Sequence, residues 1–313
     1  MADSPLLEQL DQAIDALLRG EAQPAEPARL VLIAAELRHL PDERFKARLK
    51  TELQRKSPMT ATAYTTIREG FRTVTPYINV TDGDRFIEFL KGAFGAVEVL
   101  RHTVSPDAFH AEVRIGDSML MIGASPHGNN PGRFHVFVED CDAVFRNAIA
   151  AGGKSLGEPA DRPYGERSGF VEDVFGNMWY IATPLAGTPL PGTPAREHAG
   201  TVVPYLHPTK ARGYIDFLNR AFGAEELFVV EHNGVVPHAA VRIGDAVIEM
   251  GEGPSQRAPS GFFMYVEDVD AVYARAVAAG ATGVRPPANQ SYGHRDATVR
   301  DLYGYTWNPA SLI

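Results

Sequence analysis

The chain has 313 residues, of which 44 % are hydrophobic and 22 % charged, and its formal net charge is −9. No apolar run approaches the roughly 20 residues of a membrane-spanning helix, and the negative charge argues against general binding to nucleic acid or anionic membranes. Cys141 is the only cysteine, which excludes an internal disulfide framework and, with a polar N-terminus that lacks a signal sequence, predicts a cytoplasmic protein.

The first 57 residues are predicted to form a separate helical region. Ser4 and Pro5 suit the N-cap and first turn of a helix, apolar residues follow at helical spacing, and Gly20 ends the pattern. Residues 58–70 are expected to link this region to the rest of the chain.

A shift of 128 residues aligns two stretches of the chain without a gap, residues 73–185 and residues 201–313. Val113-Arg-Ile-Gly-Asp117, for example, meets Val241-Arg-Ile-Gly-Asp245. A period of this length is too long for a solenoid and indicates two whole domains that arose by duplication. We therefore expect a first domain at 71–185, a Pro/Gly-rich linker at 186–199 and a second domain at 200–313.

Each repeat is predicted to contain two successive units, and each unit consists of a strand, a helix and three further strands. In the first repeat, the first unit has a strand at Val74–Val80, a helix at Arg85–Phe94, and strands at Val97–Thr103, Phe109–Ile115 and Met119–Gly123. The second unit has a strand at Phe134–Val138, a helix at Asp142–Ala151, and strands at Pro159–Pro163, Gly169–Asp173 and Met178–Ala182.

These paired βαβββ units resemble the vicinal oxygen chelate superfamily, which includes glyoxalase I, extradiol dioxygenases and the fosfomycin- and bleomycin-resistance proteins. Within this superfamily, the sequence motifs are most similar to those of the PhnB-like branch. The motifs that carry the resemblance are Phe94-Gly-Ala96, Val138-Glu-Asp140, Tyr164-Gly-Glu-Arg167 and Asp173-Val-Phe-Gly-Asn-Met-Trp179. The resemblance implies an α+β fold class, with tandem domains of paired βαβββ modules that form cupped mixed sheets after an N-terminal helical region.

Superfamily members often pair their modules between chains or between tandem domains. The resemblance therefore implies that the two copies here pair with each other, as a monomer with pseudo-two-fold symmetry, or that the chain forms a homodimer. A small-molecule ligand is expected as a partner, and nucleic acid and membranes are not.

Metal-dependent members of the superfamily place one ligand, usually His or Glu, on each of four strands. Carried over by position, the first copy offers Thr75, Met121, Arg133 and Tyr180, and the second copy offers Val203, Glu249, Gly261 and Asn308. Arg133 would repel a cation, and Glu249 alone does not hold a transition metal. The resemblance therefore implies that the usual metal site is absent and that no cofactor is bound, with a divalent metal at a displaced site as the alternative.

Further polar residues are expected on the cup face of each copy, because alternate residues of a strand share a face. In the first copy these residues are Tyr77, Asn79, His110, Glu112 and His135, and in the second copy they are Tyr205, His207, His238 and Glu249.

The candidate catalytic pairs are His110 with Glu112 and His238 with Glu249, because a carboxylate beside an imidazole supports acid–base chemistry near neutral pH. Two histidines and a carboxylate, with His207 in the second cup, are also a possible facial triad for a displaced metal.

The remaining candidate ligand-binding residues lie late in each copy. Arg167 and Arg295 either clamp a substrate carboxylate or form a surface ion pair. Trp179 and Trp307 are either a ligand platform or core residues, and Tyr180 lies beside Trp179 in the sequence.

Three functions remain open, because one fold hosts many activities. The first is a glyoxalase/bleomycin-resistance-like protein that binds a small organic molecule in a cupped sheet pocket without the usual metal. The second is a glyoxalase-related lyase, isomerase or dioxygenase with a displaced metal or acid–base site. The third is a non-catalytic protein-interaction module.

Overall fold

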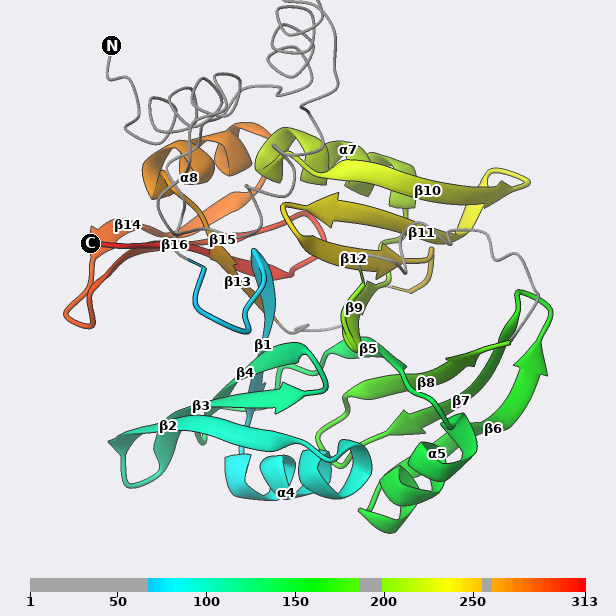
Figure 1. The fold of residues 1–313 in the computed structure, drawn as a ribbon. Coiled ribbons are helices and arrows are strands. Elements are labelled where there is room, and N and C mark those ends of the chain that lie inside the picture. The colour runs from blue at the N-terminus through cyan, green and yellow to red at the C-terminus, as the bar shows by residue number, and fades with distance from the viewer. Residues whose placement is uncertain (1–66, 186–198, 255–260) are drawn as a thin grey trace, which may run out of the picture. The chain divides into compact units, whose positions relative to one another are not determined.

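The computed structural model of the chain describes residues 67–185, 199–254 and 261–313 (Figure 1). The predicted helical region at 1–57, most of the linker at 58–70 and nearly all of the linker at 186–199 lie outside the described residues. Within the described residues, no helix is long and apolar enough to cross a membrane.

Four βαβββ modules follow one another, two in each sequence repeat. Module 1 consists of β1 (Val74–Val80), α4 (Gly83–Phe94), β2 (Val97–Ser105), β3 (Ala108–Ile115) and β4 (Ser118–Ala124). Module 2 consists of β5 (Arg133–Phe137), α5 (Cys141–Ala150), β6 (Lys154–Arg162), β7 (Glu166–Glu172) and β8 (Met178–Pro184). Module 3 consists of β9 (Val202–Leu206), α7 (Ala211–Phe222), β10 (Glu225–His232), β11 (Val235–Ile243) and β12 (Ala246–Met250). Module 4 consists of β13 (Gly261–Tyr265), α8 (Val269–Ala278), β14 (Thr282–Asn289), β15 (His294–Arg300) and β16 (Thr306–Leu312).

The strand β6 is longer than the sequence predicts, because it starts at Lys154 rather than at Pro159. Proline has no N–H to donate and is tolerated mainly at the edge of a sheet. The strand β6 is such an edge strand, so Pro159 fits within it.

Both sheets combine modules from the two repeats. Sheet A has the strand order β14-β15-β16-β13-β1-β4-β3-β2, and sheet B has the order β10-β11-β12-β9-β5-β8-β7-β6. The repeats join where β1 pairs antiparallel with β13 and β5 pairs antiparallel with β9, and Figure 1 shows β1, drawn in blue, beside β13. Parallel pairs such as β1 with β4 make the sheets mixed. The predicted fold class is confirmed, and so is the pairing of the two copies with each other.

Hydrogen bonds between the repeats reinforce this pairing. The carboxylate of Asp117, in the turn between β3 and β4, accepts a hydrogen bond from the Thr201 N–H at 2.6 Å. The pseudo-symmetric Asp245 accepts one from the Thr73 N–H at 2.7 Å. Gly116 has a φ of +57°, and a Cβ at this position would collide with Thr201. These contacts explain why threonine and Gly-Asp recur at the same places in both repeats.

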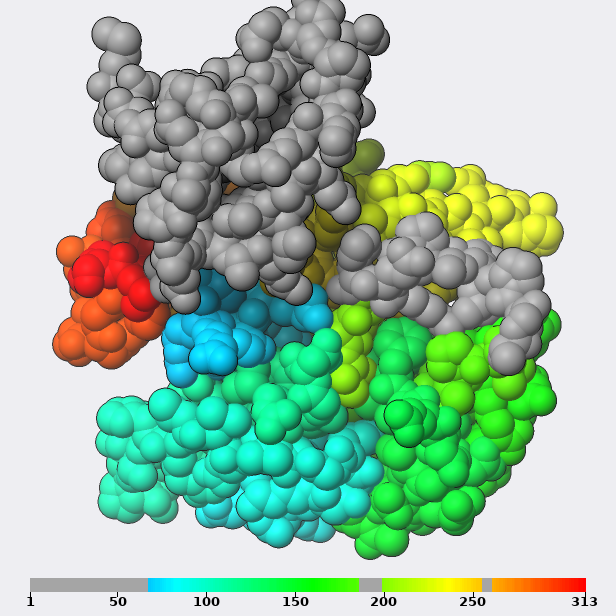
Figure 2. All heavy atoms as spheres, in the orientation of Figure 1, coloured from blue at the N-terminus to red at the C-terminus, as the bar shows by residue number. Residues whose placement is uncertain are grey.

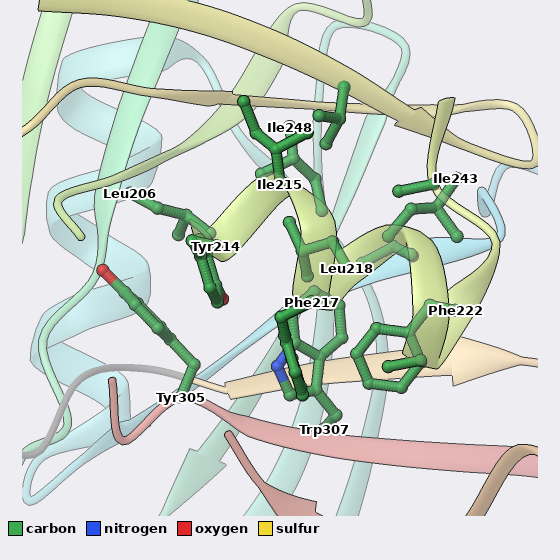
Figure 3. Packing of buried hydrophobic residues seen from close by; sticks show 14 of the residues in the cluster. Leu206, Tyr214, Ile215, Phe217, Leu218, Phe222, Ile243, Ile248, Tyr305 and Trp307 are labelled. Atoms are coloured by element: carbon green, nitrogen blue, oxygen red, sulfur yellow. The ribbon is translucent and has the colours of Figure 1, made fainter. Parts of the chain in front are cut away.

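Each repeat builds a hydrophobic core of its own. Helices α4 and α5 pack together between modules 1 and 2, and α7 and α8 pack together between modules 3 and 4. On α7, apolar residues at helical spacing, such as Phe217 and Phe222, point toward Trp307 (Figure 3). In Figure 2 the cyan and green atoms of modules 1 and 2 meet along a continuous surface. A repeat therefore supplies a complete core but only half of each sheet.

The motif Asp-x-x-Gly-x-x-Trp closes each core. Asp173 accepts a hydrogen bond from the Trp179 indole N–H at 3.0 Å, and Asp301 accepts the corresponding bond from Trp307 at 2.9 Å. Each aspartate also accepts two backbone N–H groups of the turn between the last two strands of its module. Both indoles are fully buried against the helices. The motif that contributed to the family resemblance therefore serves the fold.

Candidate functional site

Each sheet has one surface that packs against its helices and an opposite surface, which we name face A in sheet A and face B in sheet B. The side chains discussed on face A are Tyr77, His110, Glu112 and Met121 from module 1, and Phe263, Tyr265 and Asn308 from module 4. Those on face B are Arg133, His135, Glu166 and Tyr180 from module 2, and Tyr205, His207, His238 and Glu249 from module 3. Every face thus draws its side chains from both repeats.

The expected grouping of His135 with His110 and Glu112 is wrong. His135 lies on β5 in sheet B, whereas His110 and Glu112 lie on β3 in sheet A. The reason is the pairing of modules between the repeats, which brings His135 beside Glu249 of the second copy. The structure does place His110 near Glu112 and His238 near Glu249, with N–O distances of 3.6 and 3.7 Å.

A buried acid–base cluster occupies the middle of face B. The Nδ1 atom of His135 lies 2.8 Å from Glu249 Oε2, and its Nε2 atom lies 3.4 Å from Glu166 Oε2. Burial raises the pKa of Glu249, but His135 and His238 outweigh burial and hold this pKa well below its usual value. Glu249 is therefore a buried carboxylate that contacts with His135 and His238 hold in its charged form.

Arg133 stands two residues before His135 on the same face, among aromatic side chains. Its charge acts on Tyr180, Tyr205 and His207, which places all three close to it. The rings of Tyr180 and Tyr205 lie 5.2 Å apart between centroids, and the Tyr180 hydroxyl lies 3.3 Å from His207 Nε2. We call Arg133, Tyr180, Tyr205 and His207 the Arg133 cluster.

Two polar atoms of the Arg133 cluster have unused hydrogen-bonding capacity. Arg133 Nε and His207 Nδ1 are buried, and neither has a hydrogen-bond partner in the part of the chain that the structure describes. Burial, together with the nearby charge of Arg133, lowers the pKa of His207 to about 4, so that its imidazole is neutral at pH 7. Burial likewise raises the pKa of Tyr180, which keeps its phenol protonated.

On face A, the negative charge of Glu112 is neutralised by another residue of the chain. Arg68, which precedes β1, donates two hydrogen bonds to the Glu112 carboxylate, one of them 2.7 Å long. Burial raises the pKa of Glu112, but hydrogen bonds from His110 and Arg68 outweigh burial and lower it. The apolar contacts of the same segment involve Ile67, Phe71, Met119, Met121 and Tyr265. Residues 67–71 therefore lie on face A and pair with its carboxylate.

Two further candidates are on face A or at its edge. The Tyr77 hydroxyl lies 3.4 Å from His110 Nδ1, and the two rings stack at a centroid distance of 5.7 Å. Asn79 lies near the end of β1, where its backbone bridges to Asn130. Neither residue is near His135.

Four of the predicted ligand-binding residues lie on the helix side of the sheets. Arg167 donates to Asp142 at the start of α5, and Arg295 donates to Asp270 at the start of α8. Trp179 and Trp307 are the core indoles described above. These four side chains point away from faces A and B, and their contacts account for them as parts of the fold.

The donor set at the four positions where the superfamily places metal ligands does not fit a metal ion. On face A these positions hold Thr75, Met121, Gly261 and Asn308, and on face B they hold Arg133, Tyr180, Val203 and Glu249. Face A offers no carboxylate or imidazole there, and face B offers one carboxylate beside a fixed cation. Among the described residues, no group of three or more His, Cys, Asp or Glu side chains is arranged to hold a metal.

Sequence reasoning missed three residues of these faces. From the sequence, Arg133 is expected only to repel a metal cation. However, alternate residues of a strand share a face, so Arg133 and His135 already belong to the same face. Glu166 belongs to the Tyr-Gly-Glu-Arg motif, in which only Arg167 is predicted to bind a ligand. Arg68 lies in a stretch predicted as a linker, and no local pattern connects it with Glu112.

The comparison with protein families matches one family model to the chain. The model of the Glyoxalase/Bleomycin resistance protein/Dioxygenase superfamily matches residues 71–181 and 210–308. The uncharacterized protein Mb0911c of Mycobacterium bovis is 31 % identical over 127 residues, which cover 36 % of this chain and 83 % of that protein. The uncharacterized protein Rv0887c of Mycobacterium tuberculosis is also 31 % identical over 127 residues, which cover 74 % of its length.

Solved structures show the same fold. Glyoxalase I from Zea mays is similar with a TM-score of 0.59 and 18 % sequence identity, over 77 % of this chain and 92 % of the maize chain. At this identity the likeness concerns the fold and not the activity.

Proposed function

The chain belongs to the Glyoxalase/Bleomycin resistance protein/Dioxygenase superfamily, and from this membership we propose that it binds a small organic molecule on face B, without the metal centre of the metal-dependent members. Its PhnB-like character is part of the same proposal and rests on the motifs in the sequence.

The observation that carries the proposal is the Arg133 cluster. Buried N–H groups and ring nitrogens in folded proteins nearly always have partners, and exceptions concentrate where a ligand or water supplies the missing atom. Arg133 Nε and His207 Nδ1 are such exceptions, and they occur together beside two tyrosine rings. Rings with a few convergent polar groups are the usual lining of a small-molecule site.

Face A differs in charge rather than in unpartnered atoms, because both ring nitrogens of His294, beside Phe263, are also buried without a hydrogen-bond partner among the described residues. Its arginine, Arg68, is already paired with Glu112, and its apolar residues contact the segment at 67–71. The donor set supports the absence of the usual metal centre, because Arg133 and Tyr180 stand on face B where metal-dependent members have ligands.

The test is a screen of a chemically mixed fragment library against the full chain by ligand-observed NMR. We expect ligands that compete with one another, whose binding is lost in Tyr205→Ala and kept in Tyr77→Ala, the pseudo-symmetric control on face A. The proposal fails if no fragment binds, or if Tyr77→Ala abolishes binding and Tyr205→Ala does not.

A second candidate function is acid–base catalysis of a lyase or isomerase reaction. The observation in its favour is that His238 is about one-third exposed and stands 3.7 Å from the buried Glu249 carboxylate. In that reaction, His238 would take a proton from a bound substrate while Glu249 stabilises the resulting imidazolium. Glu249→Gln would then abolish turnover of a substrate and leave its binding in place, whereas a pure binding protein shows no turnover.

We also propose a cytoplasmic monomer. The two repeats supply both halves of each sheet within one chain, and the single cysteine, Cys141, is a buried free thiol. Light scattering coupled to size-exclusion chromatography distinguishes the monomer from the homodimer, and cell fractionation tests the location.

A further inference from the structure

Arg133 differs from Arg68 and Arg285, the arginines that pair with carboxylates in sheet A, because it has no anionic partner among the described residues. Arg68 pairs with Glu112, and Arg285 pairs with Asp296. Arg133 has neither an ion pair nor a hydrogen bond in the described residues, although its Nε atom is buried. A guanidinium stays charged at any physiological pH, so the unpaired charge is permanent.

The carboxylates of face B do not neutralise this charge. Glu249 is 2.8 Å from His135, and Glu166 is 3.4 Å from the other nitrogen of the same ring. Neither carboxylate is within ion-pair distance of Arg133 among the pairs between described residues. The titratable groups on which the charge of Arg133 acts are Tyr180, Tyr205, Tyr305 and His207, all neutral at pH 7.

Face A shows what an arginine on these sheets binds. There, Arg68 holds the Glu112 carboxylate through two parallel N–H···O bonds, the bidentate geometry that matches guanidinium to an oxyanion. On face B the arginine is part of the sheet itself, and the matching carboxylate is missing. The pseudo-symmetric position of Glu112 on face B is Ala240, which has no charge to offer.

We propose that the ligand of face B is an organic anion, whose carboxylate or phosphoryl group binds the Arg133 guanidinium and whose unsaturated body lies against the rings of Tyr180 and Tyr205. When the Tyr180 hydroxyl donates to His207 Nε2, the Nδ1–H of His207 is left as a further donor toward the anion. This inference names the ligand class of the site under Proposed function and rests on it.

The test is calorimetric titration of the full chain with three probes of similar shape: benzoate, phenylphosphonate and the neutral benzamide. We expect at least one anion to bind the wild-type chain at least tenfold more tightly than benzamide. The anion that binds more tightly distinguishes a carboxylate from a phosphoryl ligand. Arg133→Gln should lose this preference, and Arg133→Lys should keep part of it.

The matched control is Arg167→Gln, which removes one arginine of the same module on the helix side and should leave all three affinities unchanged. The inference is overturned if benzamide binds the wild-type chain as tightly as the anions, if neither anion binds, or if folded Arg133→Gln keeps the preference. Face-B ligands from the mixed library that are all neutral or cationic would overturn the inference alone. A library without any ligand would overturn the proposed function as well.

Discussion

Faces A and B stand on the same scaffold but are neutralised in different ways. On face A, the carboxylate of Glu112 is on β3 and its arginine, Arg68, comes from the segment before β1. On face B, the carboxylate of Glu249 is on β12 and pairs with His135, while Arg133 on β5 is left without an anion among the described residues. The arginine of face A is thus paired within the chain, whereas Arg133 on face B has no carboxylate partner among the described residues.

The cores of the two repeats, by contrast, have kept the same design. Trp179 with Asp173 and Trp307 with Asp301 are bonded alike and are equally buried. After duplication, the positions that hold the fold have been retained and the positions on the faces have diverged. Four predictions test this contrast, from the largest expected effect to the smallest.

The similarity of the cores predicts equal, large losses of stability. Trp179→Ala and Trp307→Ala should each lower the free energy of unfolding by about 3–5 kcal/mol, because each removes a fully buried indole and leaves a cavity. Urea denaturation followed by circular dichroism measures both. The exposed Val104→Ala should stay within about 0.5 kcal/mol of the wild type. A large loss in one repeat and a small loss in the other would contradict a shared core design.

The two arginines should affect stability in opposite directions. Arg68→Gln leaves the buried Glu112 carboxylate with only His110 and should lower the free energy of unfolding by about 2 kcal/mol, less than for a fully buried pair because Arg68 is partly exposed. Arg133→Gln removes an unpaired charge and should leave stability unchanged or raise it by about 1 kcal/mol. Urea denaturation of both variants provides the comparison.

The double variant Arg68→Gln/Glu112→Gln should recover part of the loss, because both charges are then absent. If Arg133→Gln instead destabilised the chain as much as Arg68→Gln, Arg133 would have a partner inside the protein and face B would be complete.

The histidine of the Arg133 cluster predicts a pH dependence that face A lacks. The pKa of His207 is about 4 in the folded chain and about 6.5 when unfolded, so the unfolded chain takes up the proton first as the pH falls. His207 therefore lowers stability progressively between about pH 6.5 and pH 4, by about 1–2 kcal/mol after allowance for its partial exposure.

The variant His207→Gln should lack this component of the acid sensitivity, whereas Asn79→Ala, at the pseudo-symmetric position of face A, should leave it in place. Thermal melts between pH 4 and pH 7 measure the difference. A parallel pH profile for His207→Gln and the wild type would show that His207 is not held neutral by Arg133 and burial.

The smallest effects are expected on the helix side. Arg167→Gln and Arg295→Gln each remove a solvent-exposed ion pair to a helix N-terminus, so each should change the melting temperature by no more than about 2 °C. Neither should change ligand binding. Loss of binding in Arg167→Gln would revive its assignment as a substrate clamp and weaken the distinction between the helix side and face B.

The sequence predicted the modules well, because strand and helix periodicities and the 128-residue shift are local or internal signals. It allowed the copies to pair with each other and left a homodimer as the alternative. It grouped His135 with the wrong carboxylate, because which module joins which sheet is decided by long-range pairing of β5 with β9. Arg68 could not be assigned for the same reason, since its partner Glu112 is 44 residues away.

For the tryptophans and Arg167, the sequence left a ligand-binding role and a structural role open. The contacts of Trp179 with Asp173 and of Arg167 with Asp142 favour the structural role, because they are local requirements of the fold. On this scaffold, recurrence between the copies indicates structure. Differences between the copies indicate where a ligand site should be sought. An example is Arg133 in the first copy, which corresponds to Gly261 in the second.

The central claim, that face B binds the ligand and face A does not, is tested most directly by titrating benzoate and phenylphosphonate into Arg133→Gln and Arg68→Gln side by side. The account predicts that Arg68→Gln keeps the wild-type affinity for the preferred anion and that Arg133→Gln loses at least tenfold. The reverse result, with affinity lost in Arg68→Gln and kept in Arg133→Gln, would place the ligand on face A and contradict the account.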